Sequence, residues 1–223
     1  MIRKTVVTAM LTVVTAGAAW AEDTEARPRL EISGTAGWTW AEGVTGNGVK
    51  VAGVGTFDRI NPNNSWSFGL RLGFMATKHL EFGGLANLQP ADVHVLGTAT
   101  VKVGDMTIRN YHGYFAYNFG EAKIRPYVLG GLGVTQYGSM TVTVANANRS
   151  ISGQTKFSTT WGAGVKLFPA KHLGIRVEGR WTPTHIKPDT VGWWCDPYWG
   201  CYVVTNSQYS KQVEIAGGLT LRF

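Results

Sequence analysis

The final stretch of the chain constrains the fold more than any other. From Gln212 onward, apolar or small residues alternate with mostly polar or small ones: Val213, Ile215, Gly217, Leu219, Leu221 and Phe223 against Gln212, Glu214, Ala216, Gly218, Thr220 and Arg222. A β-strand turns successive side chains to opposite faces. The pattern therefore predicts a strand over residues 210–223 with one apolar face and one polar or small face. That strand ends on Phe223, which belongs to the apolar face.

Seven more segments have the length of a strand, and most of them show the same alternation. They cover residues 30–40, 65–75, 80–88, 110–119, 124–137, 157–167 and 173–182. Each is close to the ~9–11 residues that a tilted strand needs to cross a bilayer. In 124–137, glycines on both faces leave open which residues point inward. The sequence thus predicts an all-β fold with eight strands.

The connections between these strands alternate between short and long. The short ones are residues 76–79, 120–123 and 169–172. Alternation of short turns with long loops is typical of outer-membrane barrels, in which the short turns face the periplasm. Two of the short turns run into the next strand with the same letters, Lys78-His79-Leu80 and Lys171-His172-Leu173, which indicates shared turn chemistry.

Two of the long connections contain hairpin signals. Residues 98–108 are interpreted as a hairpin that turns at Gly104-Asp105, a residue pair that tight turns favour. Residues 140–151 are interpreted in the same way, with the turn at residues 145–148. We therefore expect the strands on both sides of these connections to extend beyond the membrane as a rigid β-collar.

The charged residues decide which face of the strands points inward. An arginine on the lipid-facing side near the bilayer midplane costs about 2–4 kcal/mol. We therefore expect the following residues to face the lumen and to form an ion-pair and hydrogen-bond network there: Glu31, Arg71, Glu81, His112, Lys166, Arg176, Glu178, Arg180, Glu214 and Arg222. Because the interior of an eight-stranded barrel is about wide enough for side chains to fill, this network is expected to close the lumen.

The N-terminus and the composition fit an exported all-β protein. Residues 1–21 combine a basic start, an apolar middle and the small-x-small pattern Ala19-Trp20-Ala21, which predicts a cleaved signal peptide. Residues 22–223 are then the barrel domain. The chain has 29 glycines and only 16% charged residues, as expected for tightly packed strands. Its basic residues are scattered, which argues against a nucleic-acid partner.

Three elements resemble a known family. They are the signal sequence, the segment 124–133 (IRPYVLGGLG) and the C-terminal Leu219-Thr220-Leu221-Arg222-Phe223. Together they resemble the small outer-membrane β-barrel family, of the OmpA transmembrane-domain and opacity-protein type. The resemblance implies an eight-stranded antiparallel up-and-down transmembrane β-barrel in the cell outer membrane. An ordinary edge strand that ends in phenylalanine is the alternative interpretation of the C-terminus.

The resemblance also implies partners. Leu219, Leu221 and Phe223 match the terminal signal that the barrel assembly machinery recognises in this family. Outer-membrane lipid and lipopolysaccharide are the expected surroundings, and the protein is expected to be a monomer. No cofactor is expected.

The last long loop carries the only two cysteines of the chain, Cys195 and Cys201. In an exported protein such a close pair predicts a disulfide. A zinc site is disfavoured, because no set of further metal ligands lies near the two cysteines in the sequence. Five aromatic residues surround the pair: Trp193, Trp194, Tyr198, Trp199 and Tyr202. Exposed aromatic side chains on a constrained loop suit recognition of a surface ligand. Alternatively, these rings form the outer aromatic girdle or pack on neighbouring loops.

The sequence favours a structural or surface-interaction role over catalysis. Lipid-modifying barrels that resemble this one need a Ser–His or comparable pair, and the deacylase type carries a His-x-Ser motif, which none of the five histidines forms. We therefore expect no enzymatic activity and no metal site. Two alternatives stay open, a low-conductance pore for small solutes and a soluble periplasmic barrel that binds a lipophile.

Overall fold

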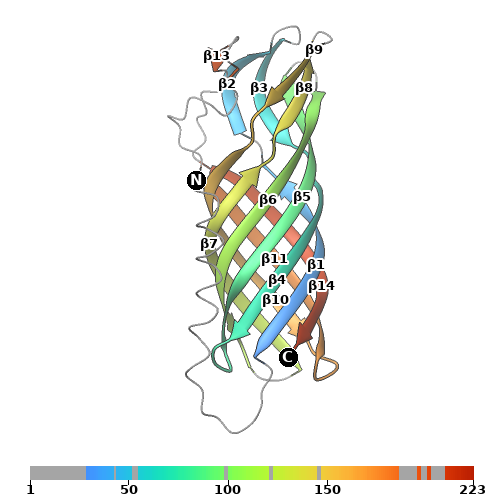
Figure 1. The fold of residues 1–223 in the computed structure, drawn as a ribbon, viewed down its shortest axis with the longest axis vertical. Helices are drawn as coiled ribbons and strands as arrows, with labels where there is room; N and C mark the ends of the chain where they lie inside the picture. The colour runs from blue at the N-terminus through green and yellow to red at the C-terminus, as the bar shows by residue number, and fades with distance from the viewer. Residues whose placement is uncertain are drawn as a thin grey trace.

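The computed structural model describes residues 29–42, 44–51, 55–97, 100–120, 123–144, 147–185, 195–196, 200–201 and 209–223. Eight long antiparallel strands form a closed barrel (Figure 1): β1 (Leu30–Ala41), β4 (Ser65–Met75), β5 (Leu80–Gly97), β6 (Thr100–Asn118), β7 (Ile124–Tyr137), β10 (Gln154–Leu167), β11 (Leu173–His185) and β14 (Tyr209–Arg222). The ring closes where β1 pairs with β14. The predicted eight-stranded up-and-down barrel is therefore confirmed. Among the described residues, no helix has the length and apolarity needed to cross a membrane.

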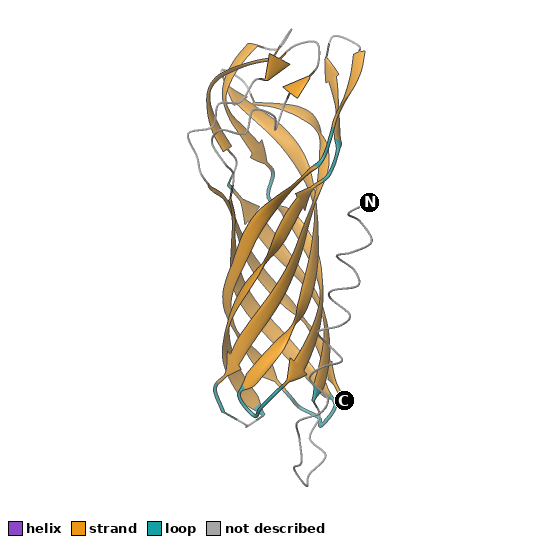
Figure 2. Ribbon diagram, turned by 60° about the vertical axis from the view of Figure 1, so that its left-hand side comes forward, coloured by secondary structure: helices purple, strands orange, loops and turns teal. Residues whose placement is uncertain are grey.

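The two ends of the barrel differ (Figure 2). Short turns between β4 and β5, between β6 and β7 and between β10 and β11 lie at one end, together with the C-terminus. At this end the backbone N–H of Phe223 donates to the carbonyl of Leu30, and the N–H of Leu30 donates to the carbonyl of Phe223. The last residue therefore takes part in closing the barrel. The predicted signal peptide, residues 1–21, lies outside the described residues.

At the other end, the β-structure continues past the ring of eight strands (Figure 1). The strands β5 and β6 are 18 and 19 residues long and pair along almost their whole length. The strands β2 (Val44–Val51) and β3 (Gly55–Pro62) form a further hairpin whose β3 pairs with β5. This hairpin was not predicted from the sequence. The predicted β-collar is present, and it is larger than expected.

The prediction of a turn at Gly104-Asp105 is wrong. Gly104 pairs with Val93 and Asp105 pairs with Asp92, inside the long β5–β6 ladder. The pairing register shifts between Val93 and His94, because the opposite strand holds one extra residue there. A glycine inside a strand often marks such a bulge rather than a chain reversal. The predicted hairpin over residues 140–151 is confirmed by β8 (Met140–Val144), which pairs with β9 (Ala147–Ile151).

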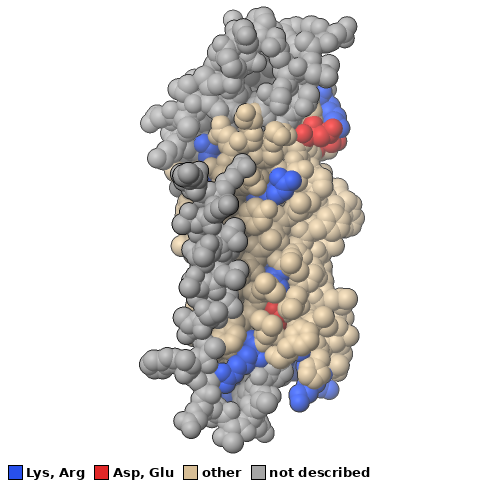
Figure 3. Space-filling view, in the orientation of Figure 1, with Lys and Arg blue, Asp and Glu red and all other residues tan. Residues whose placement is uncertain are grey.

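The outer face of the barrel is apolar. Along β14, Val213, Ile215, Leu219 and Leu221 have exposed fractions between 46% and 60%, whereas Glu214 on the opposite face is 6% exposed. Figure 3 shows a largely uncharged band around the visible face, with most of its Lys and Arg toward the two ends. A soluble barrel would place its apolar residues inside, so this arrangement suits a barrel surrounded by lipid.

The two short turns with the letters Lys-His-Leu share a backbone contact that we call the histidine clasp. In the first, Nδ1 of His79 lies 2.9 Å from the carbonyl oxygen of Asn118, and the N–H of Asn118 donates to the carbonyl of His79. In the second, Nδ1 of His172 lies 2.9 Å from the carbonyl oxygen of Arg222, and the N–H of Arg222 donates to the carbonyl of His172. Each clasp therefore fastens the last residues of a neighbouring strand, β6 or β14.

Removing one clasp is expected to lower the free energy of unfolding modestly. His79→Ala and His172→Ala each delete one side-chain hydrogen bond, worth about 0.5–1.5 kcal/mol. The matched control is Lys171→Ala, because Lys171 is exposed in the same turn as His172. Urea unfolding of the barrel in lipid vesicles measures the difference. Equal stability of His172→Ala and Lys171→Ala would show that the clasp contributes nothing.

Candidate functional site

The lumen next to the short turns holds a cluster of five charged residues from five different strands. Nζ of Lys166 lies 2.7 Å from Oε2 of Glu31 and also bonds to Glu81. Nη2 of Arg222 lies 3.0 Å from Oε1 of Glu31. Nη2 of Arg176 lies 3.7 Å from an oxygen of each carboxylate. Two carboxylates thus share three cations, and the four residues Glu31, Glu81, Lys166 and Arg176 are each only 1% exposed.

The middle of the lumen is bridged by a bidentate ion pair. Nη1 and Nη2 of Arg71 lie 2.8 and 2.7 Å from the two carboxylate oxygens of Glu178. The hydroxyl of Tyr127 donates to the same carboxylate. Such a forked arrangement is the strongest geometry that an arginine and a carboxylate can adopt. It links β4 to β11, which are not neighbours in the ring.

A third bridge lies closer to the long-loop end. Arg180 bonds to Glu214 on the adjacent strand, and Nδ2 of Asn87 lies 3.1 Å from Oε1 of Glu214. On the next level, Nδ2 of Asn110 donates to Oε1 of Gln212 at 3.0 Å. Both amide contacts join strands on opposite walls of the barrel. The lumen is therefore crossed by side-chain bonds at several heights.

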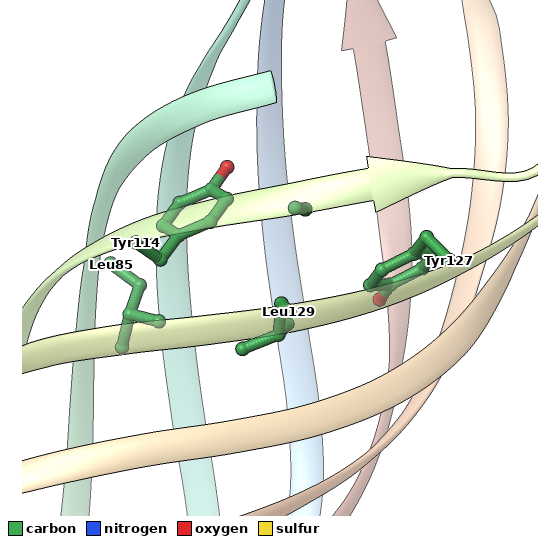
Figure 4. Packing of buried hydrophobic residues seen from close by; sticks show 5 residues of the cluster. Leu85, Tyr114, Tyr127 and Leu129 are labelled. Atoms are coloured by element: carbon green, nitrogen blue, oxygen red, sulfur yellow. The ribbon is translucent and has the colours of Figure 1, made fainter. Parts of the chain in front are cut away.

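A small apolar cluster fills the space beside these bridges. It consists of Leu85, Tyr114, Ala116, Tyr127 and Leu129, and Figure 4 shows the side chains of β5, β6 and β7 converging inside the barrel. The hydroxyl of Tyr114 donates to Oε1 of Glu81 at 2.6 Å. The guanidinium of Arg71 lies 4.9 Å from the centre of the Tyr114 ring. The two tyrosines therefore connect the apolar cluster to the ion pairs.

The structure places the predicted residues as follows. All ten residues expected in the lumen are buried, with exposed fractions of 7% or less. Asn87, Tyr114 and Tyr127 are members of the network that the sequence did not identify as such. The alternation could have indicated Asn87 and Tyr114, because they lie on the inward faces of their strands. The inward position of Tyr127 was hidden by the glycines of β7.

The remaining predicted residues lie outside the lumen. Leu219, Leu221 and Phe223 face outward, and Phe223 is 61% exposed. Cys195 and Cys201 are paired backbone positions in the short hairpin of β12 (Cys195–Asp196) and β13 (Gly200–Cys201). The five aromatic residues Trp193, Trp194, Tyr198, Trp199 and Tyr202 fall outside the described residues.

A closed barrel with an apolar belt and a charged, bridged lumen defines a transmembrane β-barrel. The chain belongs to the outer membrane protein beta-barrel domain family, whose model matches residues 6–223. The protein is accordingly located in the outer membrane. A search of curated proteins found no match.

Three solved structures show the same fold. Neisserial surface protein A (NspA) has 11% identity and a TM-score of 0.54, with 87% of this chain and 97% of that chain covered. OprG from Pseudomonas aeruginosa has 13% identity and a TM-score of 0.56, with 88% and 96% covered. AlkL, determined by solid-state NMR in DMPC bilayers, has 10% identity and a TM-score of 0.54, with 92% and 95% covered. Identities this low establish the shared fold alone.

Proposed function

We propose that this protein is a closed structural barrel of the outer membrane that presents its β-collar and loops to the exterior. The observation that carries the proposal is the set of cross-lumen bonds. Arg71–Glu178, Lys166–Glu81 and Asn87–Glu214 each join strands that are separated by two others in the ring. A continuous water path would require several of these buried contacts to break together. This arrangement favours a plugged lumen over the low-conductance pore.

The interior also disfavours the soluble lipophile-binding barrel. Such a barrel needs an apolar chamber, whereas the lumen here contains nine charged side chains: Glu31, Arg71, Glu81, Lys166, Arg176, Glu178, Arg180, Glu214 and Arg222. The large exposed apolar side chains lie on the outside instead. Charged side chains buried against a lipophile would have no polar partner there, and their desolvation would make binding of the lipophile unfavourable.

A role without catalysis is part of the proposal. The lumen does contain a histidine next to a serine, because Nε2 of His112 lies 2.9 Å from Oγ of Ser158. Both residues are 1% exposed. Within the described residues, Nδ1 of His112 has no hydrogen-bond partner, so the third group that orients the base in a catalytic triad is missing. The pair is better explained as part of the polar packing of the lumen.

Surface contact is proposed for the loop between β11 and β14. Its ends leave the barrel opposite the short turns, which face the periplasm in outer-membrane barrels. The paired backbone positions of Cys195 and Cys201 favour a disulfide, since residues directly opposite in an antiparallel pair lie about 4.5–5.5 Å apart at Cα. We propose that the aromatic residues on either side of and between these cysteines in the sequence, Trp193, Trp194, Tyr198, Trp199 and Tyr202, contact a ligand outside the cell.

The remaining proposed partners would contact the lipid-facing residues. Leu219, Leu221 and Phe223 project outward from the closing strand, where the barrel assembly machinery would contact them before the ring closes. Outer-membrane lipid and lipopolysaccharide would surround the apolar belt. Residues 1–21 are proposed as the export signal that brings the chain to this membrane.

Thiol labelling of intact cells tests the orientation and the disulfide together. In the wild type, a membrane-impermeant maleimide is expected to label the protein only after treatment with a reducing agent. The single-cysteine variant Cys195→Ser is expected to be labelled at Cys201 without reduction. Failure to label this variant on intact cells, combined with labelling after lysis, would place the loop on the periplasmic side and contradict surface display.

A further inference from the structure

The Glu31 cluster, as we call the five charged residues next to the short turns, consists of Glu31, Glu81, Lys166, Arg176 and Arg222. It lies close to the end of the barrel. Glu31 is the second residue of β1, Glu81 is the second residue of β5, and Lys166 is the last residue but one of β10. Lysine and glutamate side chains are mostly exposed in proteins. These three are nevertheless only 1% exposed. Other side chains must therefore cover the cluster on the side of the opening.

Phe168 has the position that such a cover requires. Inward and outward residues alternate along a strand, so Phe168 follows Lys166 on the inward face and lies nearer to the opening. Leu167, between them, is 37% exposed on the outer face, whereas Phe168 is 6% exposed. The backbone N–H of Phe168 donates to the carbonyl of Lys123 at 2.8 Å. This bond ties the residue to the turn between β6 and β7.

Two arginines hold the ring of Phe168. The guanidinium carbon of Arg222 lies 3.5 Å from the centre of the ring, and that of Arg125 lies 5.4 Å from it. A cation within about 6 Å of an aromatic ring is attracted to its face. Arg222 also belongs to the Glu31 cluster, because its Nη2 lies 3.0 Å from Oε1 of Glu31. The ring is therefore in direct contact with the charged residues that it would cover.

The neighbouring backbone leaves room for this ring and for nothing larger than glycine beside it. A Cβ atom added to Gly174 on β11 would lie 2.6 Å from two carbons of the Phe168 ring, which is closer than unbonded carbon atoms approach. On another wall, Met75 ends β4, is 8% exposed and lies directly opposite Glu81 in the β4–β5 ladder. β4 and β10 are not neighbours in the ring. Buried apolar side chains thus approach the end of the cluster from two sides.

We propose that Phe168, with Met75 on the other wall, forms an apolar seal that keeps periplasmic water away from the Glu31 cluster. The inference rests on the closed lumen proposed above, and it assigns the closure at the short-turn end to side chains outside the ion-pair network. Buried charge pairs are screened much less than exposed ones. The seal therefore preserves the strength of the bonds that cross the lumen at this height.

Hydrogen exchange of the Lys166 ammonium group, followed by NMR in lipid nanodiscs, tests the seal. These protons exchange only on contact with water, so the wild type is expected to give a slowly exchanging signal, which Lys166→Arg assigns by its disappearance. Phe168→Ala is expected to speed this exchange about tenfold or more, while the backbone amide of Ile215, paired on both sides within β14, stays as protected as before. The matched control is Phe119→Ala, which removes a 49% exposed ring at the same end and is expected to change neither rate.

Two further variants separate the cover from other roles of the ring. Phe168→Leu keeps an apolar side chain without the attraction to arginine, and slow exchange is expected to persist. Gly174→Ala displaces the ring, so fast exchange is expected, and this variant gives the same test if Phe168→Ala does not fold.

Unchanged exchange at Lys166 in both Phe168→Ala and Gly174→Ala would overturn the seal. A parallel rise at Lys166 and Ile215 would overturn it as well, because the ring would then only stabilise the barrel as a whole. Conductance of the wild type is a separate readout. A baseline current together with either of these results would retain the closed lumen and remove the seal alone.

Discussion

Glu178→Gln is expected to lower the free energy of unfolding by about 3–5 kcal/mol, the usual cost of removing one partner from a buried ion pair. The substitution keeps the shape of the side chain and removes its charge. Arg71, which is 5% exposed and donates to both oxygens of Glu178, would then remain charged without its counterion. Urea unfolding in lipid vesicles, followed by tryptophan fluorescence, measures the loss.

Two companion variants identify the cause. The triple variant Arg71→Met/Glu178→Met/Tyr127→Phe removes the whole hydrogen-bonded group. Its free energy of unfolding is expected to return close to the wild-type value, because no buried charge is left without a partner. Lys211→Met removes a cation from an exposed pair, in which Nζ lies 3.8 Å from Oε2 of Glu42, and is expected to have no measurable effect. A triple variant as unstable as Glu178→Gln would show that the loss does not come from an uncompensated charge.

Val177→Arg is expected to have the second largest effect, a destabilisation of about 2–4 kcal/mol. Val177 points outward at 51% exposure, midway between Leu173 and Trp181 among the apolar outer residues of β11. Its chain neighbours Arg176 and Glu178 point into the lumen. An arginine at position 177 would therefore lie in hydrocarbon, whereas the native Arg176 lies in the lumen.

The depth dependence supplies the control for this variant. Ile124 is also outward-facing, at 59% exposure, but it begins β7 directly after a short turn. Ile124→Arg is expected to cost only about 0–1 kcal/mol, because its side chain reaches the membrane surface. Vesicle-based unfolding of both variants gives the comparison. Equal costs would mean that the outer face of β11 does not cross the apolar core of a bilayer.

The sequence allowed the strands and their faces to be predicted because alternation is a local signal. Arg176, Val177 and Glu178 illustrate this, since adjacent residues in one strand must point to opposite sides. Charge then decided which side is inward. The same reasoning missed the bulge at Gly104, because a glycine-aspartate pair resembles a turn unless the pairing partner across the ladder is known.

The partners inside the lumen could not be predicted in the same way. Arg71 meets Glu178 although two strands separate them in the ring, and that meeting depends on the stagger of all the strands in between. Lys166 likewise reaches two carboxylates, on β1 and β5. Alternation places a side chain inside the barrel, but only the register fixes its height and therefore its partner.

Conductance of the purified wild-type protein in a planar bilayer tests the central claim, a lumen closed by cross-barrel bonds, most directly. Insertion is verified by the mobility shift of the unboiled band on a gel, which a folded, detergent-resistant barrel shows relative to the boiled sample. With insertion established, the bonds of Arg71, Lys166 and Asn87 across the lumen predict that the membrane current stays at its baseline. Stable current steps proportional to voltage from the wild-type protein would contradict a closed lumen and would identify the protein as a pore.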